Sequence, residues 1–495
     1  MDDRLREFRP APGREDGPPA AAAGRRRPAA LVGDTIAAMR ARNWLRTLVA
    51  PLVAAVAVGA AAAVVLGANN GGGDGVDSVA PSALAAGFPP ARSAAADFGG
   101  GSVQVSALAA DGATEVAAGS ADRGCALWVS ADGGATWRRA AVALAAAGRT
   151  AARATPGQLA GVAHGRSGWL AVGDAAAEAA AAGSDLAPAV IGSRDGRTWT
   201  AVPPAGGASV FGGTSRIVTA AVAAGAGGYV IVGQAAAPAG APRTVAAAWY
   251  APGLTGWRRA SGSRPGELDG PGNRAMNAVS ATGRGFVADG AAGDRPAVWV
   301  SAAGRTWTLV TLALPAGAAS AAFDYVAADR GVLAAVGTEI TRAGQRRPFA
   351  AVSSDGGIAW TTPLPLPSPA GDDPTATVAA TALTAAGGDF VAVGAYGQPR
   401  ETDVVVWALP AAAAAGTAWT EAAPQGTGLA GLGTHAITAL TAAGVTLTGI
   451  GFSTPAMSAA SAASAASAAS AASAASATSA GALTEPTIWQ SPVRS

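Results

Sequence analysis

Six tryptophans close successive units of this chain at intervals of 50 to 62 residues: Trp137, Trp199, Trp257, Trp307, Trp360 and Trp419. Each follows the same order of segments, namely an apolar strand, a glycine turn, a Val-rich strand that ends in Gly, a variable loop and a third strand. A seventh, divergent unit begins near Ala436 and reaches Trp489. The chain is therefore built from repeats, and each repeat contains short strands.

Four short strands in each of six or seven units are typical of a β-propeller, whereas a solenoid would show shorter and more regular periods. The sequence predicts an all-β fold, a single propeller of about seven four-stranded blades over residues 101–495. The seventh unit stops after its third strand. We expect residues 85–100 to supply the missing strand, because an open ring would leave one sheet uncovered.

The N-terminal region predicts a membrane anchor. Residues 1–43 read as a disordered cytoplasmic tail, 44–68 as a transmembrane helix and 69–100 as a flexible stalk. No residue from Thr47 to Ala68 is charged, and this length can cross a bilayer. Arg residues precede the segment and Asp residues follow it, so the N-terminus is expected in the cytoplasm.

This topology makes the chain a single-pass protein of the cell membrane with an extracytoplasmic propeller. The alternative for the same segment is a signal peptide cleaved near Gly67. A second unusual segment repeats Ser-Ala-Ala over 458–479. Because it lacks large apolar side chains, we expect a low-complexity loop inserted in the seventh unit.

The charge distribution argues against nucleic-acid binding. Residues 1–46 hold ten Arg and six acidic residues, and the remaining chain holds 24 Arg and 26 acidic residues. A slightly acidic ectodomain has no electrostatic attraction for phosphates. Cys125 is the only cysteine and reads as a core residue. His164 and His435 have no neighbours at ligand spacing, so the sequence predicts no metal site and no cofactor.

Four turns before the closing tryptophans share a pattern of Ser, Asp, Gly and Trp. They are Ser130–Trp137, Ser193–Trp199, Ser301–Trp307 and Ser353–Trp360, the third with Ala303 in place of Asp. The Asp should accept hydrogen bonds from backbone N–H groups just ahead, and the Trp should fill apolar space between strands. The pattern resembles the Asp-box, or BNR repeat, of sialidase-like and photosystem II assembly-factor-like propellers. In that family the boxes lie on the outer rim, which implies a structural role.

The same resemblance raises the question of catalysis. Sialidases of this kind use three arginines, a Tyr–Glu pair and an acidic Asp. The closest match to their Arg-Ile-Pro motif is Ser215-Arg216-Ile217-Val218, which lacks the Pro. Asp372 and Asp373 read as a solvated loop, and no nucleophile elbow, phosphate loop or zinc motif occurs. The sequence therefore predicts no catalytic residue.

Two functions remain open. The first is a membrane-tethered binding or assembly module for a protein or glycan of the cell envelope, with variable loops at Ala175–Pro188, Ala235–Arg243 and Thr338–Arg347. The alternative is a sialidase-like glycoside hydrolase with its active site at the central channel. That alternative requires charged side chains to converge there, and the candidates are Arg216, Arg274, Asp294 and Asp324.

Overall fold

The computed structural model describes residues 89–99, 102–122, 124–143, 157–176, 186–202, 210–211, 217–237, 243–369, 376–398, 401–411, 418–422, 424, 428–444, 446–455 and 485–492. The predicted tail 1–43, transmembrane segment 44–68 and Ser-Ala-Ala insert 458–479 lie outside these ranges. Within them, no helix has the length and apolar character needed to cross a bilayer.

The described chain is all-β apart from one short helix, α2 (Ala95–Phe98). Its strands form antiparallel groups of four, which we number as blades 1 to 7 along the chain, and one parallel pairing joins blades 6 and 7 into an eight-stranded sheet. Blade 1 contains β2 (Val103–Asp111), β3 (Thr114–Ala121), β4 (Gly124–Ser130) and β5 (Arg138–Arg139). Blade 2 contains β7 (Gly157–Gly165), β8 (Gly168–Ala176), β9 (Leu186–Ser193) and β10 (Thr198–Ala201). Blade 3 contains β11 (Ile217–Gly225), β12 (Gly228–Ala236), β13 (Thr244–Ala251) and β14 (Arg258–Arg259).

The later blades repeat this order. Blade 4 contains β16 (Arg274–Thr282), β17 (Gly285–Ala292), β18 (Arg295–Ser301) and β19 (Thr306–Thr311). Blade 5 contains β20 (Ala318–Asp329), β21 (Val332–Thr341), β22 (Arg346–Ser353) and β23 (Leu364–Pro365). Blade 6 contains β24 (Thr377–Ala386), β25 (Asp389–Gln398), β26 (Glu401–Pro410) and β27 (Thr420–Ala422). Blade 7 contains β28 (Gly433–Ala443), β29 (Thr446–Pro455), β30 (Glu485–Pro492) and β1 (Arg92–Ser93).

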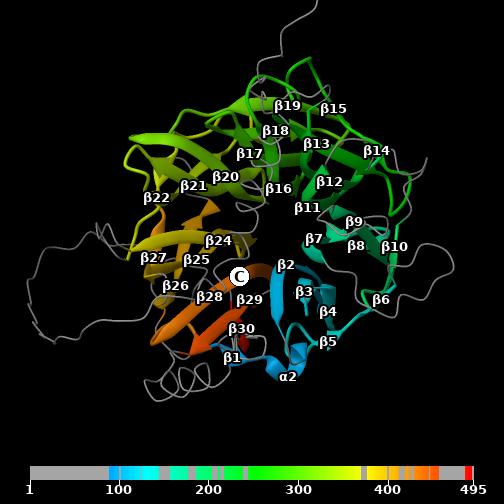
Figure 1. Cartoon of the computed structure of the whole chain (residues 1–495), viewed down its shortest axis with the longest axis vertical. Helices are drawn as coiled ribbons and strands as arrows, with labels where there is room; N and C mark the ends of the chain where they lie inside the picture. The colour runs from blue at the N-terminus through cyan, green and yellow to red at the C-terminus, as the bar shows by residue number, and fades with distance from the viewer. Residues whose placement is uncertain are drawn as a thin grey trace, which may run out of the picture.

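The blades stand in a closed ring. The first strand of each blade contacts the first strand of the next, in the order β2, β7, β11, β16, β20, β24, β28 and back to β2. Figure 1 shows these strands nearest the centre, with the short fourth strands outermost. Two linkers add a parallel strand to the outer edge of the following blade, β6 (Ala141–Ala143) on β10 and β15 (Ser261–Gly262) on β19. The predicted all-β, propeller-like fold is confirmed.

The ring closes through the N-terminal segment. Strand β1 pairs antiparallel with β30, Arg92 opposite Ile488 and Ser93 opposite Thr487. The expectation that residues 85–100 supply the missing fourth strand is therefore confirmed. The pairing also corrects a predicted boundary. Residues 92–98 belong to the ring, so the stalk predicted over 69–100 must end before residue 92. The backbone groups of β1 hydrogen-bond to a sheet edge that would otherwise be unpaired.

Helix α2 and Arg92 fasten the closing strand to blade 1. The Arg92 guanidinium contacts the Asp97 carboxylate at 2.6 Å and donates to the carbonyl of Ala135 at 2.7 Å. Phe98 is 2% exposed, and its ring centroid lies 5.0 Å from that of Trp128 and 5.8 Å from that of Trp137. The seam between blades 7 and 1 is thus closed by buried aromatic packing as well as by strand pairing.

The closing tryptophans lie in the interfaces between blades. Trp137, Trp199, Trp257 and Trp307 are buried, whereas Trp360 and Trp419 are partly exposed. Trp199, for example, packs in one cluster with Val116 and Leu127 of the preceding blade. In four turns the indole N–H donates to the carbonyl of the turn glycine three residues earlier, at 2.8 to 3.1 Å. These tryptophans therefore hold both the turn and the interface.

The predicted hydrogen bonds of the Ser–Asp turns are present. Asp132 accepts from the Thr136 N–H at 2.9 Å and from the Thr136 hydroxyl at 2.6 Å. These bonds, with one from Ser130, lower the pKa of Asp132 to about 2. Asp195 and Asp355 accept in the same way from backbone N–H groups ahead of them. Because these carboxylates are committed to their own turns, they have a structural role.

Every first strand contains a β-bulge at the same position, and a glycine lies opposite it. The register shifts follow Val105, Leu159, Thr219, Met276, Phe323, Ala380 and Ile437. The facing glycines are Gly119, Gly173, Gly233, Gly290, Gly337, Gly394 and Gly451. A Cβ at these positions would lie only 1.8 to 2.4 Å from a carbonyl oxygen of the bulged strand. The Val-Gly signature of the second strands therefore marks a close backbone approach.

A buried carboxyl at the seam gives a pH-dependent prediction. Glu115 is fully buried, Thr448 donates to its Oε1 at 3.1 Å, and its Oε2 has no hydrogen-bond partner. Burial raises its pKa above the ordinary 4.5, so the folded state binds a proton more tightly than the unfolded state. Wild-type stability should fall as the pH rises from 4.5 through the raised pKa.

Glu115→Gln should therefore raise the free energy of unfolding by about 1 kcal/mol at neutral pH, because no charge is buried. Urea unfolding at several pH values measures it, and the gain should vanish below pH 4.5. Exposed Glu485 in the same seam supplies the control Glu485→Gln. A gain that is independent of pH would contradict the role of ionisation.

Candidate functional site

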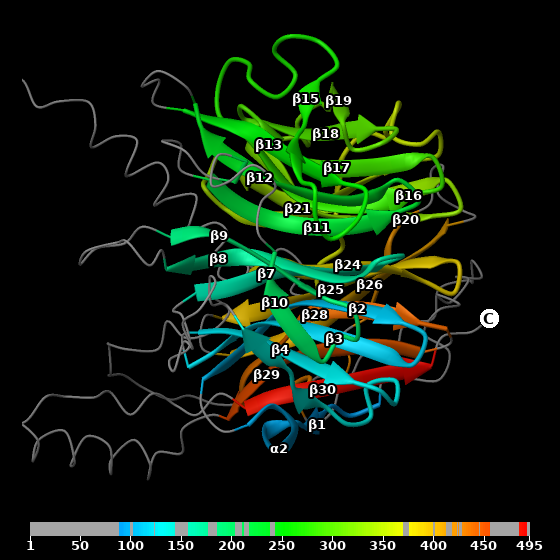
Figure 2. The same cartoon turned by 90° about the vertical axis from the view of Figure 1, so that its right-hand side faces the viewer.

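The two ends of the ring differ. At one end the first and second strands are joined by two-residue turns, such as 112–113 and 283–284, and the Ser–Asp turns lie there too. At the other end the first and third strands begin, and the longer connections join here, including those across 177–185 and 456–484. Figure 2 shows β2, β11 and β16 running away from this side. We call it the loop-bearing end.

The three predicted variable loops are shorter than expected. β8 continues through Ala176 and β9 begins at Leu186, while β12 continues through Ala236 and β13 begins at Thr244. Only residues 342–345 separate β21 from β22, so most of Thr338–Arg347 is strand. The second and third strands of these blades therefore continue to pair through much of the ranges that were predicted as loops.

The three candidate channel residues that the structure describes occupy different places in the fold. Arg216 and the Asp372–Asp373 pair lie outside the described residues. Asp294 occupies the exposed turn between β17 and β18. Asp324 is the bulge residue of β20, and Thr338 donates to its carboxylate at 2.9 Å. Arg274 points into the protein, as described below.

The inner strands are joined by hydrogen bonds from their bulge residues. Asn277 donates to the carbonyl of Phe323 in the next blade at 2.7 Å. Thr381 donates to Ile437 at 2.5 Å, and Thr438 donates across the closing seam to Val105 at 2.7 Å. Each acceptor is the residue that precedes the bulge in the following blade. These polar side chains around the centre thus hold neighbouring blades together.

The cysteine and the two histidines that the sequence analysis considered have structural contacts. Cys125 is buried, and burial raises its pKa to about 12, so it is a core residue as expected. His164 lies 3.4 Å from the Asp111 carboxylate, and buried His435 contacts the Ser453 hydroxyl at 3.0 Å. Among the described residues, no three His, Cys, Asp or Glu side chains gather as a metal site would require.

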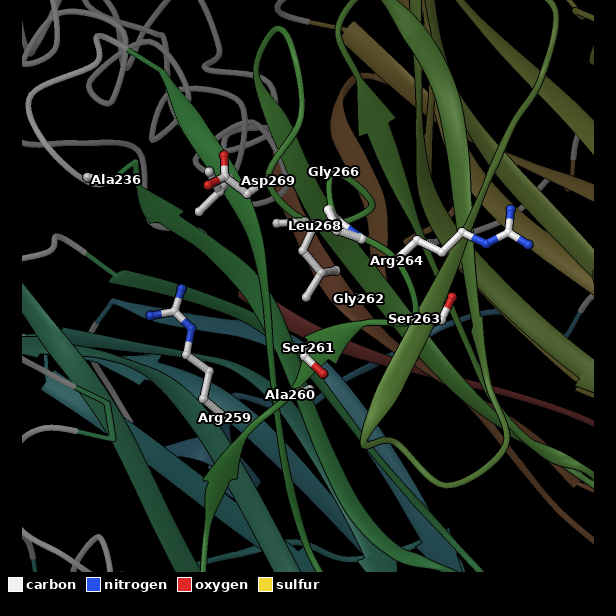
Figure 3. A pocket seen from close by; sticks show the side chains of 13 residues that line it. Ala236, Arg259, Ala260, Ser261, Gly262, Ser263, Arg264, Gly266, Leu268 and Asp269 are labelled. Carbon is white, nitrogen blue, oxygen red and sulfur yellow. The ribbon is translucent and has the colours of Figure 1, made fainter.

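A hollow of about 500 Å³ lies at the loop-bearing end between blades 3 and 4. Blade 3 contributes Ala236, Val245, Ala246, Arg259 and Ala260, and the linker to blade 4 contributes Ser261, Gly262, Ser263, Arg264, Pro265, Gly266, Leu268 and Asp269. Figure 3 shows Arg259, Leu268 and Asp269 around one space, whereas Arg264 points away from it. The volume is in the range of small-molecule sites.

The linker wall of the hollow is held in place from both blades. Arg274 donates to the carbonyls of Gly266 and Glu267, and the Trp299 indole also donates to Glu267, at 2.9 Å. From blade 3, the Ala246 N–H donates to the carbonyl of Leu268 at 3.1 Å. Burial lowers the pKa of the Arg274 guanidinium. This arginine, predicted as a channel residue, instead supports the wall of a preformed cavity.

The charges around the hollow are unequal. Asp269 is paired with Arg243 at 2.5 Å, and Arg243 also donates to the Gly270 carbonyl at 2.9 Å. Arg259 forms no ion pair with any described residue, and its guanidinium carbon lies 5.9 Å from the centre of the Trp249 ring. The hollow therefore presents one uncompensated positive charge beside an apolar wall.

Sequence reasoning missed Arg259. It follows Trp257 in the run Trp-Arg-Arg-Ala, but Arg138 and Arg139 follow Trp137 in the same run. The distinguishing signal is the linker 263–273, since it precedes β16 and builds the second wall.

No family model matches the sequence, and no curated protein matches it either. Solved structures do match. Phage phi92 endosialidase is 11% identical, with 83% of this chain and 69% of that chain covered and a TM-score of 0.41. A Trypanosoma rangeli sialidase with the inhibitor DANA is 12% identical, with 79% and 55% covered and a TM-score of 0.34. NanB sialidase from Streptococcus pneumoniae is 11% identical, with 76% and 68% covered and a TM-score of 0.37. Likeness at this level carries no information on activity.

Proposed function

We propose that this protein is a membrane-tethered binding module whose loop-bearing end holds a ligand of the cell envelope, a protein or a glycan. The observation that carries the proposal is the preformed hollow between blades 3 and 4. Its wall is fixed by Arg274 and Trp299 before any ligand arrives, which lowers the entropic cost of binding. Its described lining contains one carboxylate, that of Asp269, which is already paired. A paired-carboxylate glycosidase needs two acids that face each other.

The tether of this module is residues 44–68, with residues 1–43 in the cytoplasm. Arginines precede this segment and aspartates follow it, which supports an exported propeller. In intact cells, protease added outside should leave the N-terminal tail intact. Digestion of that tail from outside would reverse the proposed orientation.

A glycoside hydrolase is the second candidate, and one cluster favours it. Tyr396 on β25 lies near the carboxylates of Asp403 and Glu421, and burial together with these two charges raises its pKa. A carboxylate beside a phenol can accept its proton as the phenol attacks, so Asp403 or Glu421 would have to act as a general base against the raised pKa of Tyr396. Release of reducing sugar from an envelope glycan, lost in Tyr396→Phe, would favour this candidate.

Capture from solubilised envelope tests the binding function. The immobilised full-length chain should retain a component that Ser261→Trp fails to retain, because the indole fills the hollow. Arg284→Trp, on the exposed turn at the opposite end, is the matched control and should retain it. Capture that is equal for both variants, or absent for the wild type, would overturn the proposal.

A further inference from the structure

We propose that the hollow between blades 3 and 4 binds a small molecule that carries a carboxylate on an aliphatic body, with the carboxylate on Arg259. The inference goes beyond the proposed function, since it assigns the hollow a small-molecule ligand in addition to the protein or glycan held at the loop-bearing end. Three properties of the lining lead to it, namely its charge, its apolar surface and its fixed shape.

The charge selects an anion. A guanidinium presents a planar fork of N–H donors that matches the two oxygens of a carboxylate. The other charged groups nearby are already occupied, because Asp269 is held by Arg243 and Glu267 accepts from the Ser263 hydroxyl at 2.6 Å. Of the two arginines in the lining, Arg264 points away from the hollow in Figure 3, which leaves Arg259 as the cation available to a ligand; it forms no ion pair with a described residue. Its guanidinium carbon lies 5.9 Å from the centre of the Trp249 ring, within the range of a cation–π contact.

The apolar surface selects an aliphatic body. Side chains of Ala, Val, Leu and Pro supply most of the lining, at Ala236, Val245, Ala246, Ala260, Pro265 and Leu268. Sugars are usually held by exposed aromatic faces and several hydroxyl partners. Here Trp249 is fully buried beneath Arg259, and Ser263 is already bonded to Glu267. The lining therefore fits a hydrocarbon chain better than a sugar ring.

The fixed shape makes the site selective for ligand size. The carbonyls of Gly266, Glu267, Leu268 and Gly270 are all held by donors from blades 3 and 4. Such a wall cannot collapse onto a smaller ligand, so acetate would leave most of the hollow unfilled. A longer chain gains about 0.8 kcal/mol for each CH₂ that it buries.

Calorimetric titration of the full-length chain with hexanoate tests the proposal. Saturable binding is expected below about 10 mM, at least about 10-fold tighter than acetate and at least about 10-fold tighter than hexanamide. The acetate arm measures the aliphatic contribution, and the hexanamide arm measures the charge. Arg259→Gln should weaken hexanoate binding about 10-fold or more.

Arg258→Gln is the matched control, because Arg258 precedes Arg259 on β14 and does not line the hollow. It should leave the affinity for hexanoate unchanged. Equal affinities for hexanoate and hexanamide, an unchanged affinity in Arg259→Gln, or no saturable binding would each overturn the inference. If envelope capture is still lost in Ser261→Trp while hexanoate fails to bind, the binding function stands and only the ligand class is wrong.

Discussion

Phe98→Ala is expected to lower the free energy of unfolding by about 3–5 kcal/mol, the range for truncation of a buried aromatic ring. The side chain is 2% exposed and packs against Trp128 and Trp137 of blade 1. Its backbone carbonyl also accepts from the Trp128 indole at 3.2 Å. Removing the ring leaves a cavity at the seam where the two ends of the ring meet. On one side of that seam stands blade 7, whose fourth strand β1 comes from the opposite end of the sequence.

Urea unfolding followed by circular dichroism measures this effect as a lower midpoint. The control is Leu364→Ala on the outer strand β23, where the side chain is 65% exposed. It should change stability by no more than about 0.5 kcal/mol. Similar losses in the two variants would mean that α2 does not secure the ring.

The closure also shows how far the sequence could predict the fold. The tryptophan spacing and the Val-Gly strands indicate a ring of sheets, because each unit repeats the same apolar pattern. The closing strand β1 has no such pattern, because it is only two residues long and both of them, Arg92 and Ser93, are polar. Its existence follows from the incomplete seventh unit, whereas its position at 92–93 depends on contacts with β30 that no local pattern encodes.

The candidate site was less predictable for a related reason. Arg259 ends the short strand β14 and Arg274 begins β16, and the sequence gives no sign of which one faces a cavity. The linker 263–273 determines the role of each arginine. Its carbonyl groups accept hydrogen bonds from the Arg274 guanidinium, and its side chains line the hollow beside Arg259. Such a division of roles arises only when two blades and their linker are packed together.

Gly337→Ala should destabilise the protein by about 3 kcal/mol or more, although it adds a single methyl group. Gly337 lies on β21 opposite Phe323, where the first strand of blade 5 bulges. A Cβ there would lie 2.1 Å from the Ala322 carbonyl oxygen and 2.6 Å from the Phe323 Cα. Both are backbone atoms, so no side-chain rotation can relieve the clash. The inner strand must move, and it is packed against blades 4 and 6.

Gly283→Ala supplies the matched control for the same chemical change. Gly283 lies in the turn before β17, and a Cβ there would meet nothing within 4 Å. We expect a neutral effect or a gain of up to about 1 kcal/mol, since alanine reduces the freedom of the unfolded chain. The two variants, compared by urea unfolding, separate steric from entropic effects. If Gly337→Ala were as stable as Gly283→Ala, the glycines of the second strands would have no connection with the bulges, and the recurrence of a glycine opposite the bulge in every blade would need another cause.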